Sequence, residues 1–580
     1  MKTRHRSYPA RALRYARARF RRDDFWLAGI AALLGIVCGV SVAAFDWLVK
    51  HIQLLAFGLG TGEISGADAI PPDRLWVPLA GGISVGATIW IAKHLGRRLE
   101  KVDPIEANAL TGGRIPLPGA LWIMVQTLLS HGMGASVGME GAHTQLCSAL
   151  GSKAGSLASG RRNDMRLLVA CGAGASIAAL FQSPIAGAFY AFELVIAAYS
   201  IGNLAPVVIA SLAAAGTRMV LYPSALHFAV PALSLGPSAV VMILAITFAT
   251  VAMAITVMRC CTRVETLLRA IMPAWLAPVV GGAGLAILAL ASPAALSSGR
   301  SALQDLFAQD AFWWVLAGVL VLKALAVILS IGTGFRGGLS FASLFLGMLC
   351  GKLIATLMAL LGWQPLPTEI CELVGMTISA TAIIGAPLAM AFLVAFATGD
   401  IAMVVPLVCV AALTTVLVRR LFGFSFATWR FHLRGDPIRS AADVGWLQEL
   451  KVGEMMRRDA TPVLYDTDLA QFRKRYPPGS RHRVVVTDRD GTYLGILSVP
   501  ELHNPASDDK DMADLLRLSA SYLTPEMTAP EALKHFARSG SDALAVVDRD
   551  THKALGVLME PYVLRRSAEL AERRMHALVN

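Results

Sequence analysis

A single glutamate stands among glycines in the stretch from Gly134 to Leu146, which reads GASVGMEGAHTQL. A carboxylate in such a setting can cap the first amides of a helix, occupy a site built for an anion, or carry a proton. His143 follows three residues after Glu140, and the pattern E-x-x-H also occurs in carboxylate-bridged metal sites. Glu140 is therefore the first candidate functional residue, as an anion mimic, a helix cap or a metal ligand.

The sequence lacks the further ligands that a metal site at Glu140 and His143 would need. No further E-x-x-H and no H-E-x-x-H completes a ligand set, and none of the eight cysteines has C-x-x-C or Cys/His spacing. The cysteines lie in or at the ends of apolar segments, so we interpret them as small buried hydrophobic residues. We expect neither an enzyme nor a bound metal. An intramembrane enzyme, with Ser183 beside a proline as a further polar candidate, is the alternative.

The composition places Glu140 in or near a lipid bilayer. The chain has 580 residues, of which 55% are hydrophobic and 16% charged, and its mean hydropathy is +0.57. Ten apolar segments recur between residues 25 and 418, many of them long enough to cross a bilayer core, which takes about 20 helical residues. Several contain Gly or Pro, and broken helices at membrane depth are tolerated where protein or a water-filled cavity surrounds them. The sequence predicts an all-α polytopic membrane protein with a transport pathway.

The basic residues indicate how the chain is oriented. The first 22 residues hold one lysine and eight arginines but no acidic residue, and further basic residues follow the second and the last apolar segments. By the positive-inside rule, both termini are expected in the cytoplasm. Nucleic-acid binding is the alternative for the basic N-terminus, but nothing else supports it, so no nucleic-acid partner is expected.

The two halves of the apolar region resemble each other. CGAGASIAALFQSPIAGAFYAF, from Cys171, resembles VGMTISATAIIGAPLAMAFLVA, from Val374, and each copy places a glycine twelve residues before a proline. Each copy follows a glycine-rich break that opens an apolar helix, GMEGAHTQLCSALG in the first half and GGLSFASLFLG in the second. In transporters with internal repeats, such broken helices meet near the midplane with their N-termini aimed at an anion. The repeat thus predicts an anion site, with chance matching of small residues as the alternative.

These motifs resemble those of the CLC family of voltage-gated chloride channels and chloride/proton exchangers. GGRIP, from Gly112, is similar to the family's G-S-G-I-P; GMEGA, from Gly138, to G-R-E-G-P; and GGLSFA, from Gly337, to G-G-x-F-x-P. LFQSPIAGAFYAFEL, from Leu180, is also typical of the family. The resemblance covers nearly the whole chain. It implies a homodimer surrounded by lipid in a bacterial-type inner (plasma) membrane, each subunit being an inverted repeat with its own anion pathway.

The resemblance also implies residue roles. Chloride is the expected transported ion, and Glu140 is the gate, whose carboxylate occupies an anion site when ionised and leaves it when protonated. A structural cap on its own helix is the alternative role for Glu140. The residues implied to bind the anion are Gly112, Gly113, Met139, Gly141, Leu339, Ser340 and Phe341.

Three positions depart from the family pattern. The family's central serine is Gly113 here, and its anion-contacting tyrosine falls at Ala427, so two hydroxyl donors are missing and the anion preference stays open. The exchangers' internal proton-relay glutamate falls at Leu194, with Glu193 one residue earlier. Because leucine cannot titrate, we expect a passive gated chloride channel. A chloride/proton antiporter, with water or Glu193 as relay, is the alternative.

The composition becomes charged and soluble from about Gly435. VVVTDRDGTYLGILSVPEL, from Val484, resembles LAVVDRDTHKALGVLMEPYVL, from Leu544. Each copy predicts two strands joined at an Asp-Arg-Asp turn, preceded by a helix, over 469–476 and 531–539. TAPE, from Thr528, is a capping-box pattern at the second helix. The copies resemble a pair of CBS modules, α/β units that form a tandem and in some proteins bind adenine nucleotides.

The pattern for nucleotide binding is weak in both copies. The ribose-contacting Ser/Thr and Asp of the resembling modules become Ser498 and Glu501 in the first copy, and Met559 and Tyr562 in the second. We therefore expect a structural tail without a cofactor; an adenine nucleotide, and a non-conducting membrane sensor that signals through this tail, are the alternatives. The expected domains are a basic cytoplasmic N-terminus, 1–24, a CLC-like transmembrane domain, 25–434, and a cytoplasmic CBS pair, 435–580.

Overall fold

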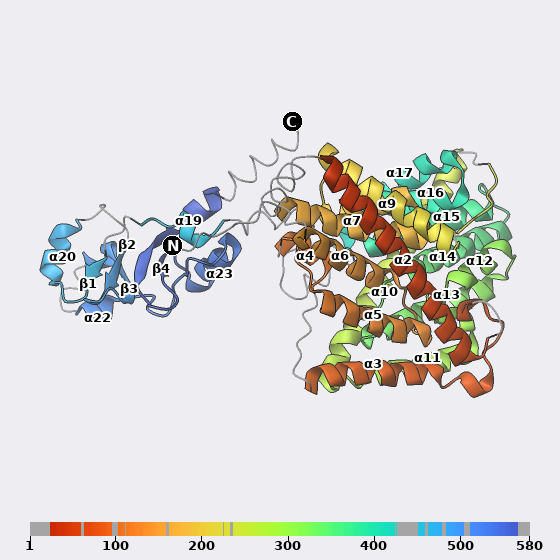
Figure 1. Cartoon of the computed structure of the whole chain (residues 1–580), viewed down its shortest axis with the longest axis horizontal. Coiled ribbons are helices and arrows are strands. Elements are labelled where there is room, and N and C mark those ends of the chain that lie inside the picture. The colour runs from red at the N-terminus through yellow and green to blue at the C-terminus, as the bar shows by residue number, and fades with distance from the viewer. Residues whose placement is uncertain are drawn as a thin grey trace, which may run out of the picture. The chain divides into compact units, whose positions relative to one another are not determined.

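The chain folds into two compact units, Met1–Ala442 and Asp443–Asn580. The first is built from helices and the second from short helices and small sheets (Figure 1). This arrangement matches the predicted all-α membrane region followed by an α/β region. The computed structural model describes residues 24–59, 63–94, 102–110, 112–157, 162–223, 226–232, 236–423, 425, 450–458, 462–477, 483–503 and 511–566.

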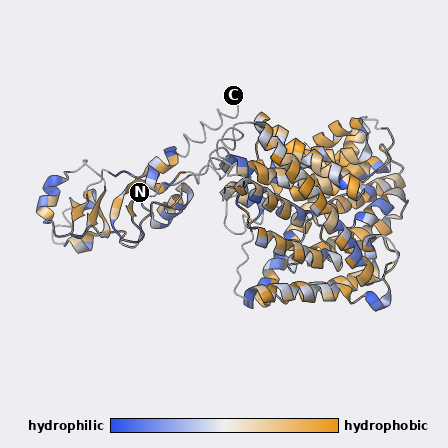
Figure 2. Cartoon of the chain, in the orientation of Figure 1, coloured by the Kyte–Doolittle hydropathy of each residue, from blue (hydrophilic) through white to orange (hydrophobic). Residues whose placement is uncertain are grey.

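The helices of the first unit are those of a multi-pass membrane protein. Within the described ranges, eight helices are long and apolar enough to cross a membrane, and apolar residues dominate this unit (Figure 2). The helices are α2 (Asp24–Phe57), α3 (Val77–His94), α4 (Pro104–Leu110), α5 (Leu117–Gly132), α6 (Glu140–Leu157), α7 (Arg162–Phe181), α8 (Pro184–Tyr190), α9 (Ile201–Leu221), α10 (Pro237–Ile271), α11 (Ala277–Ala291), α12 (Arg300–Ala308), α13 (Trp313–Gly332), α14 (Ser340–Leu360), α15 (Thr368–Ile384), α16 (Pro387–Thr398) and α17 (Val404–Leu421).

The predicted breaks in the apolar segments are present. One segment divides into α7, α8 and the π-helix η3 (Ala191–Ile196), and its counterpart in the second half divides into α15 and α16. Pro184 and Pro387 begin the second helix of each set. A proline is favoured there because its missing N–H would have had no partner inside the helix, and its ring fixes φ near the helical value.

The two halves also pack in matching ways. Gly172 of α7 lies against the carbonyl of Cys147 on α6, and Gly375 of α15 lies against that of Gly347 on α14, so closely that no side chain would fit. The two pairs occupy corresponding positions of the halves. A further contact crosses between the halves: α3 and α11 lie side by side (Figure 1), with Gly82 and Gly282 each against a proline carbonyl of the other helix. These contacts support the internal repeat.

One expectation about the cysteines is wrong in part. Six of the eight are buried, but Cys260 is half-buried and Cys409 is exposed on α17. A thiol is a small apolar group that packs equally well against other side chains or against hydrocarbon. Position within an apolar segment therefore does not reveal which face of a membrane helix a cysteine occupies.

The second unit contains the two predicted strand pairs. β2 and β3 pair antiparallel, as do β4 and β5, and β1 adds to β2 in parallel. Each hairpin has a register shift near the end of its first strand. The strands are β1 (Val463–Leu464), β2 (Arg483–Thr487), β3 (Tyr493–Ser498), β4 (Ala543–Val547) and β5 (Ala554–Met559), and the helices are α19 (Val452–Met455), α20 (Leu469–Arg475), α21 (Val499–Leu502), α22 (Met512–Leu515) and α23 (Ala529–Ser539).

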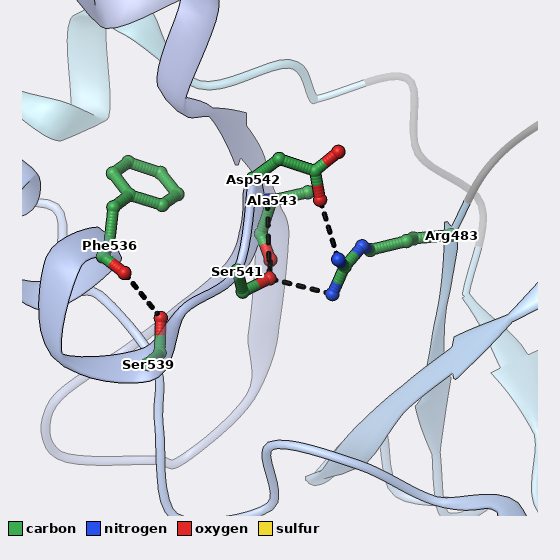
Figure 3. Close-up of polar contacts among 6 residues, drawn as sticks. All are labelled: Arg483, Phe536, Ser539, Ser541, Asp542 and Ala543. Atoms are coloured by element: carbon green, nitrogen blue, oxygen red, sulfur yellow. Dashed lines mark hydrogen bonds and ion pairs between the residues drawn. The ribbon is translucent and has the colours of Figure 1, made fainter.

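The two copies within this unit are joined by polar contacts and by a shared core. The guanidinium of Arg483, at the start of β2, donates to Ser541 Oγ at 2.6 Å and lies 2.6 Å from Asp542 Oδ1, just before β4 (Figure 3). Side chains of both hairpins form one apolar cluster, which includes Val485 of β2 and Val547 of β4. The two copies therefore fold together as one unit.

Candidate anion site and gate

Glu140 lies where one helix from each half begins. It is the first residue of α6 and is 5% exposed. Its Oε1 accepts a hydrogen bond from the backbone N–H of Ser340, the first residue of α14. Helix N-termini carry unpaired amides and a positive partial charge, so the place where these two meet favours a negative group. The carboxylate therefore caps a helix of the opposite half of the molecule.

Gly138 and Gly338 hold these two helix starts together. The N–H of each glycine donates to the carbonyl of the other, at 2.8 and 2.9 Å, and we call this pair the glycine bridge. A Cβ added at Gly141, in the first turn of α6, would lie 3.2 Å from the nitrogen of Gly338. The backbones of the two halves are thus in direct contact beside the carboxylate.

Three further residues implied to bind the anion are buried around the bridge. Met139 and Leu339 are 7% and 8% exposed, and Phe341 is 1% exposed. The Phe341 ring packs on that of Phe181, with 4.6 Å between centroids, and the guanidinium of Arg300 lies 5.4 Å from its centre. The structure therefore brings together Glu140 and the predicted residues Met139, Gly141, Leu339, Ser340 and Phe341.

The turn at Gly112 and Gly113 follows the end of α4. Both glycines have positive φ, 67° and 86°, a conformation that a serine at the second position would adopt only under strain. The N–H of Gly113 already donates to the carbonyl of Ala107, at 2.8 Å. Nearby, Ile115 N donates to Ser152 Oγ, twelve residues along α6 from Glu140. The Gly113 amide therefore helps to end α4, and anion binding by Gly112 and Gly113 stays a prediction.

The relay position and the glutamate before it lie in the π-helix η3. Leu194 lies buried in η3. The carboxylate of Glu193 accepts hydrogen bonds from Leu388 N and Ala389 N, both at 3.0 Å, in the first turn of α16. Glu193 therefore caps a helix of the other half, as Glu140 does. Ala427 lies outside the described residues.

Glu140 and His143, the two residues of the E-x-x-H motif, contact different partners. His143 Nε2 lies 3.4 Å from Asp46 Oδ1 of α2, and Asp46 Oδ2 lies 2.5 Å from Arg218 Nη2 of α9. Glu140 instead turns to Ser340. Among the residues described, no three His, Cys, Asp or Glu side chains gather as a metal site. Sequence reasoning missed this buried charge cluster, although lone charged residues within apolar segments were the available signal.

A polar cavity reaches Met139, the residue before Glu140. Its volume is about 210 Å³, which is enough for several waters. Sequence analysis did not identify it, because its lining comes from several distant segments. Beside Met139, the lining includes charged or polar side chains of both signs: Asp46, Lys50, Gln53, Glu63, His131 and Arg300.

Comparison with known proteins agrees with this fold. Residues 86–419 match the family model described as voltage gated chloride channel. The chain is 28% identical over 402 residues to the voltage-gated ClC-type chloride channel ClcB of Citrobacter koseri, covering 68% of this chain and 95% of that protein. Its fold is similar to that of a slow cyanobacterial Cl⁻/H⁺ antiporter (TM-score 0.62, 21% identity, 70% of this chain and 97% of that one). It is also similar to a eukaryotic CLC transporter (TM-score 0.60, 18% identity, 92% and 97%). The family model covers more than half of the chain, and the chain therefore belongs to the voltage-gated chloride channel family, the CLC proteins, whose activity is chloride transport.

Proposed function

We infer that the protein is a passive, gated chloride channel and that Glu140 is its gate. The observation that carries this proposal is the hydrogen bond from Ser340 N to the Glu140 carboxylate at the start of α14. That amide is where an anion would be held, so the ionised carboxylate competes with chloride for it. Protonation removes the charge and weakens the hydrogen bond, which frees the amide for chloride. The residues proposed to bind the anion are Gly112, Gly113, Met139, Gly141, Leu339, Ser340 and Phe341.

Two side chains favour passive conduction over proton-coupled exchange. Leu194, at the relay position, carries no titratable group. Glu193 uses both carboxylate oxygens on the first amides of α16, so its use as a relay would leave two helix amides without their acceptor. On this proposal the gate exchanges protons with water in the polar cavity, and no stoichiometric proton movement accompanies chloride.

A chloride/proton antiporter is the second candidate. It is supported by the fold shared with a Cl⁻/H⁺ antiporter and by the cavity, whose water and titratable side chains lie beside Met139. A water chain could carry protons where the relay glutamate is missing. The third and least supported candidate is a non-conducting sensor.

The proposal also covers the oligomeric state, the orientation in the membrane and the C-terminal unit. The protein is a homodimer with one pathway in each subunit, and both termini lie in the cytoplasm, in keeping with the basic N-terminal segment. The C-terminal unit is a CBS pair with a structural role and no nucleotide. In support, the Glu501 carboxylate at the ribose-contacting position is already paired with Arg517 Nη2, at 2.9 Å.

Flux from liposomes tests the proposal. Purified protein is reconstituted in chloride-loaded vesicles, the potential is clamped with valinomycin, and chloride and proton movement are followed together. We expect chloride efflux without uphill proton movement. Stoichiometric proton uptake against its gradient would establish the antiporter, and an intact chloride gradient would establish the sensor.

The Glu140→Gln variant tests the gate. The neutral amide mimics the protonated carboxyl, so we expect higher efflux at neutral pH and little change on acidification. Glu265→Gln is the matched control, because Glu265 pairs with Arg269 on α10 and is not part of the site. Equal flux and equal pH dependence in wild type and Glu140→Gln would remove Glu140 from the gating role.

A further inference from the structure

We propose that Gly138 and Gly338 are positioning residues for the gate: their missing side chains form the space that the Glu140 carboxylate occupies when the pathway is closed. This inference rests on the proposed gating role of Glu140. It adds two residues, one from each half, that determine whether the closed position exists at all. Neither residue is required to touch chloride.

The space around the carboxylate leaves no room for a methyl group at either position. A Cβ at Gly138 would lie 2.6 Å from both Cδ and Oε1 of Glu140, and closer still to Oε2. A Cβ at Gly338 would lie 2.5 Å from Cγ, Cδ and Oε1 of the same side chain. Real Cβ atoms do not approach other heavy atoms closer than 3.0 Å. At both positions the three nearest atoms belong to Glu140, so the side chain must move.

The backbone itself tolerates alanine at these two positions. Neither glycine has the left-handed φ that disfavours a side chain, and their hydrogen bonds to each other use only main-chain atoms. The obstruction is therefore the end of a flexible side chain, which can rotate away. Alanine at either position should preserve the glycine bridge while it excludes the carboxylate.

Gly337 provides a contrast within the same motif. A Cβ there would lie 2.6 Å from the carbonyl oxygen of Gly138 and 2.6 Å from Cβ of Val137. These atoms are fixed by the main chain, so alanine at Gly337 strains the bridge whether or not Glu140 is present. Experiment can thus distinguish Gly138 and Gly338, where the Glu140 side chain is the obstruction, from Gly337, where Gly138 and Val137 are.

The expected result is a gate held out of its site at every pH. In Gly138→Ala and Gly338→Ala, chloride efflux at neutral pH should equal that of Glu140→Ala within about twofold, and acidification should not raise it further. The other charged or titratable groups near the gate are unchanged by these variants. Among the described residues they include His143 on α6, Asp46 and Lys50 on α2, Glu63 before η1 (Ile64–Gly66), His131 on α5, Tyr190 on α8, Arg218 on α9 and Arg300 on α12.

Double variants test the inference by flux. Combining Gly138→Ala or Gly338→Ala with Glu140→Ala should give the flux of Glu140→Ala alone, because the displaced side chain is already absent. Gly216→Ala is the control, since a Cβ there meets nothing within 4 Å, and it should behave as wild type. Retention of wild-type pH dependence in both single glycine variants would overturn the inference, as would multiplicative effects in the double variants.

Thermal stability gives a readout that does not depend on transport. Gly138→Ala and Gly338→Ala should lower the Tm in the wild-type background but not in the Glu140→Ala background. Gly337→Ala should lower it equally in both. If the glycine variants lose the same stability without Glu140, the inference is wrong even if Glu140 is the gate. A second outcome is that the fall in Tm disappears in the Glu140→Ala background, but Glu140→Ala itself does not alter chloride flux. The space for the carboxylate is then established and the proposed gating role fails.

Discussion

Asp46 on α2 and Arg218 on α9 form a buried ion pair, with 2.5 Å between Oδ2 and Nη2. The side chain of Arg218 is fully buried and that of Asp46 is 6% exposed. His143, about one helical turn after Glu140, lies 3.4 Å from the other oxygen of the same carboxylate. The Asp46 carboxylate therefore joins α2 to α9 and also lies against His143 of α6.

Removal of one member of this pair should destabilise the protein strongly. Arg218→Met leaves the Asp46 carboxylate buried without its principal counter-charge, and loss of one partner of a buried ion pair costs about 3–5 kcal/mol. We expect a marked fall in Tm, measured by thermal unfolding in detergent. Asp46→Leu combined with Arg218→Met should lose less. Arg269→Met, at an exposed ion pair, is the control and should change stability by less than about 1 kcal/mol. A single variant as stable as this control would contradict the prediction.

Glu193 should behave as a helix cap. Glu193→Ala leaves two amides of α16 without their acceptor, and loss of a cap costs about 0.5–2 kcal/mol. We expect a lower Tm and no change in proton movement. Glu193→Gln keeps one carbonyl oxygen as acceptor and should lose less stability. If Tm is unchanged and proton movement is altered, Glu193 is a relay and not a cap.

Burial of Glu63 should make the stability of the folded protein depend on pH. Burial raises the pKa of its carboxyl above the ordinary 4.5, an effect that the positive charge of Arg300 opposes. A raised pKa means that the folded state favours the neutral acid. The contribution to stability is thus fully present below about pH 4.5 and is lost as the pH rises through the raised value.

Glu63→Gln should remove this loss. The Tm of the variant should exceed that of wild type at neutral pH, and the difference should shrink as the pH falls toward 4.5. Asp73→Asn is the control, because the Asp73 side chain is 74% exposed. A difference in Tm between wild type and Glu63→Gln that does not vary with pH would show that burial of this charge has no role.

The capping box at α23 should determine how readily that helix opens. Thr528 N donates to the Glu531 carboxylate at 2.8 Å, and the Thr528 side chain completes the box. Thr528→Ala should cost about 1 kcal/mol, equivalent to about fivefold faster exchange where the helix opens locally. Hydrogen exchange of residues 529–539 in the full-length chain measures this, with Glu526→Ala as control. Unchanged exchange would show that tertiary packing alone holds the helix start.

Local signals in the sequence were sufficient to predict much of the fold. Pro184 and Pro387 identify helix starts because proline lacks the N–H that a helix interior needs. The two Asp-Arg-Asp turns separate strands that the structure contains. The capping box at Thr528 was also predicted correctly. Each of these features depends on residues that are close together in the chain.

The contacts that build the candidate site lie between residues distant in sequence, and the sequence alone could not pair them. Gly138 and Gly338 are 200 residues apart, and motif resemblance placed each in a loop without showing that they bond. The resemblance implies that Gly113 binds the anion, but it could not show that the Gly113 amide donates to Ala107 at the end of α4. Cavity residues such as Asp46 and Glu63 come from separate segments, so no local pattern joins them.

The hydrogen bond between Glu140 and Ser340 also has a consequence for biosynthesis. The acceptor is synthesised 200 residues before its donor, which at about 5–20 residues per second is an interval of about 10–40 s. During that interval the nascent N-terminal half contains the Glu140 carboxylate, but the Ser340 amide that donates to it has not yet been synthesised. A chain truncated before α14 therefore contains the Glu140 carboxylate without the Ser340 amide that donates to it. On the proposed gating role, the pathway can close only after α14 has been synthesised.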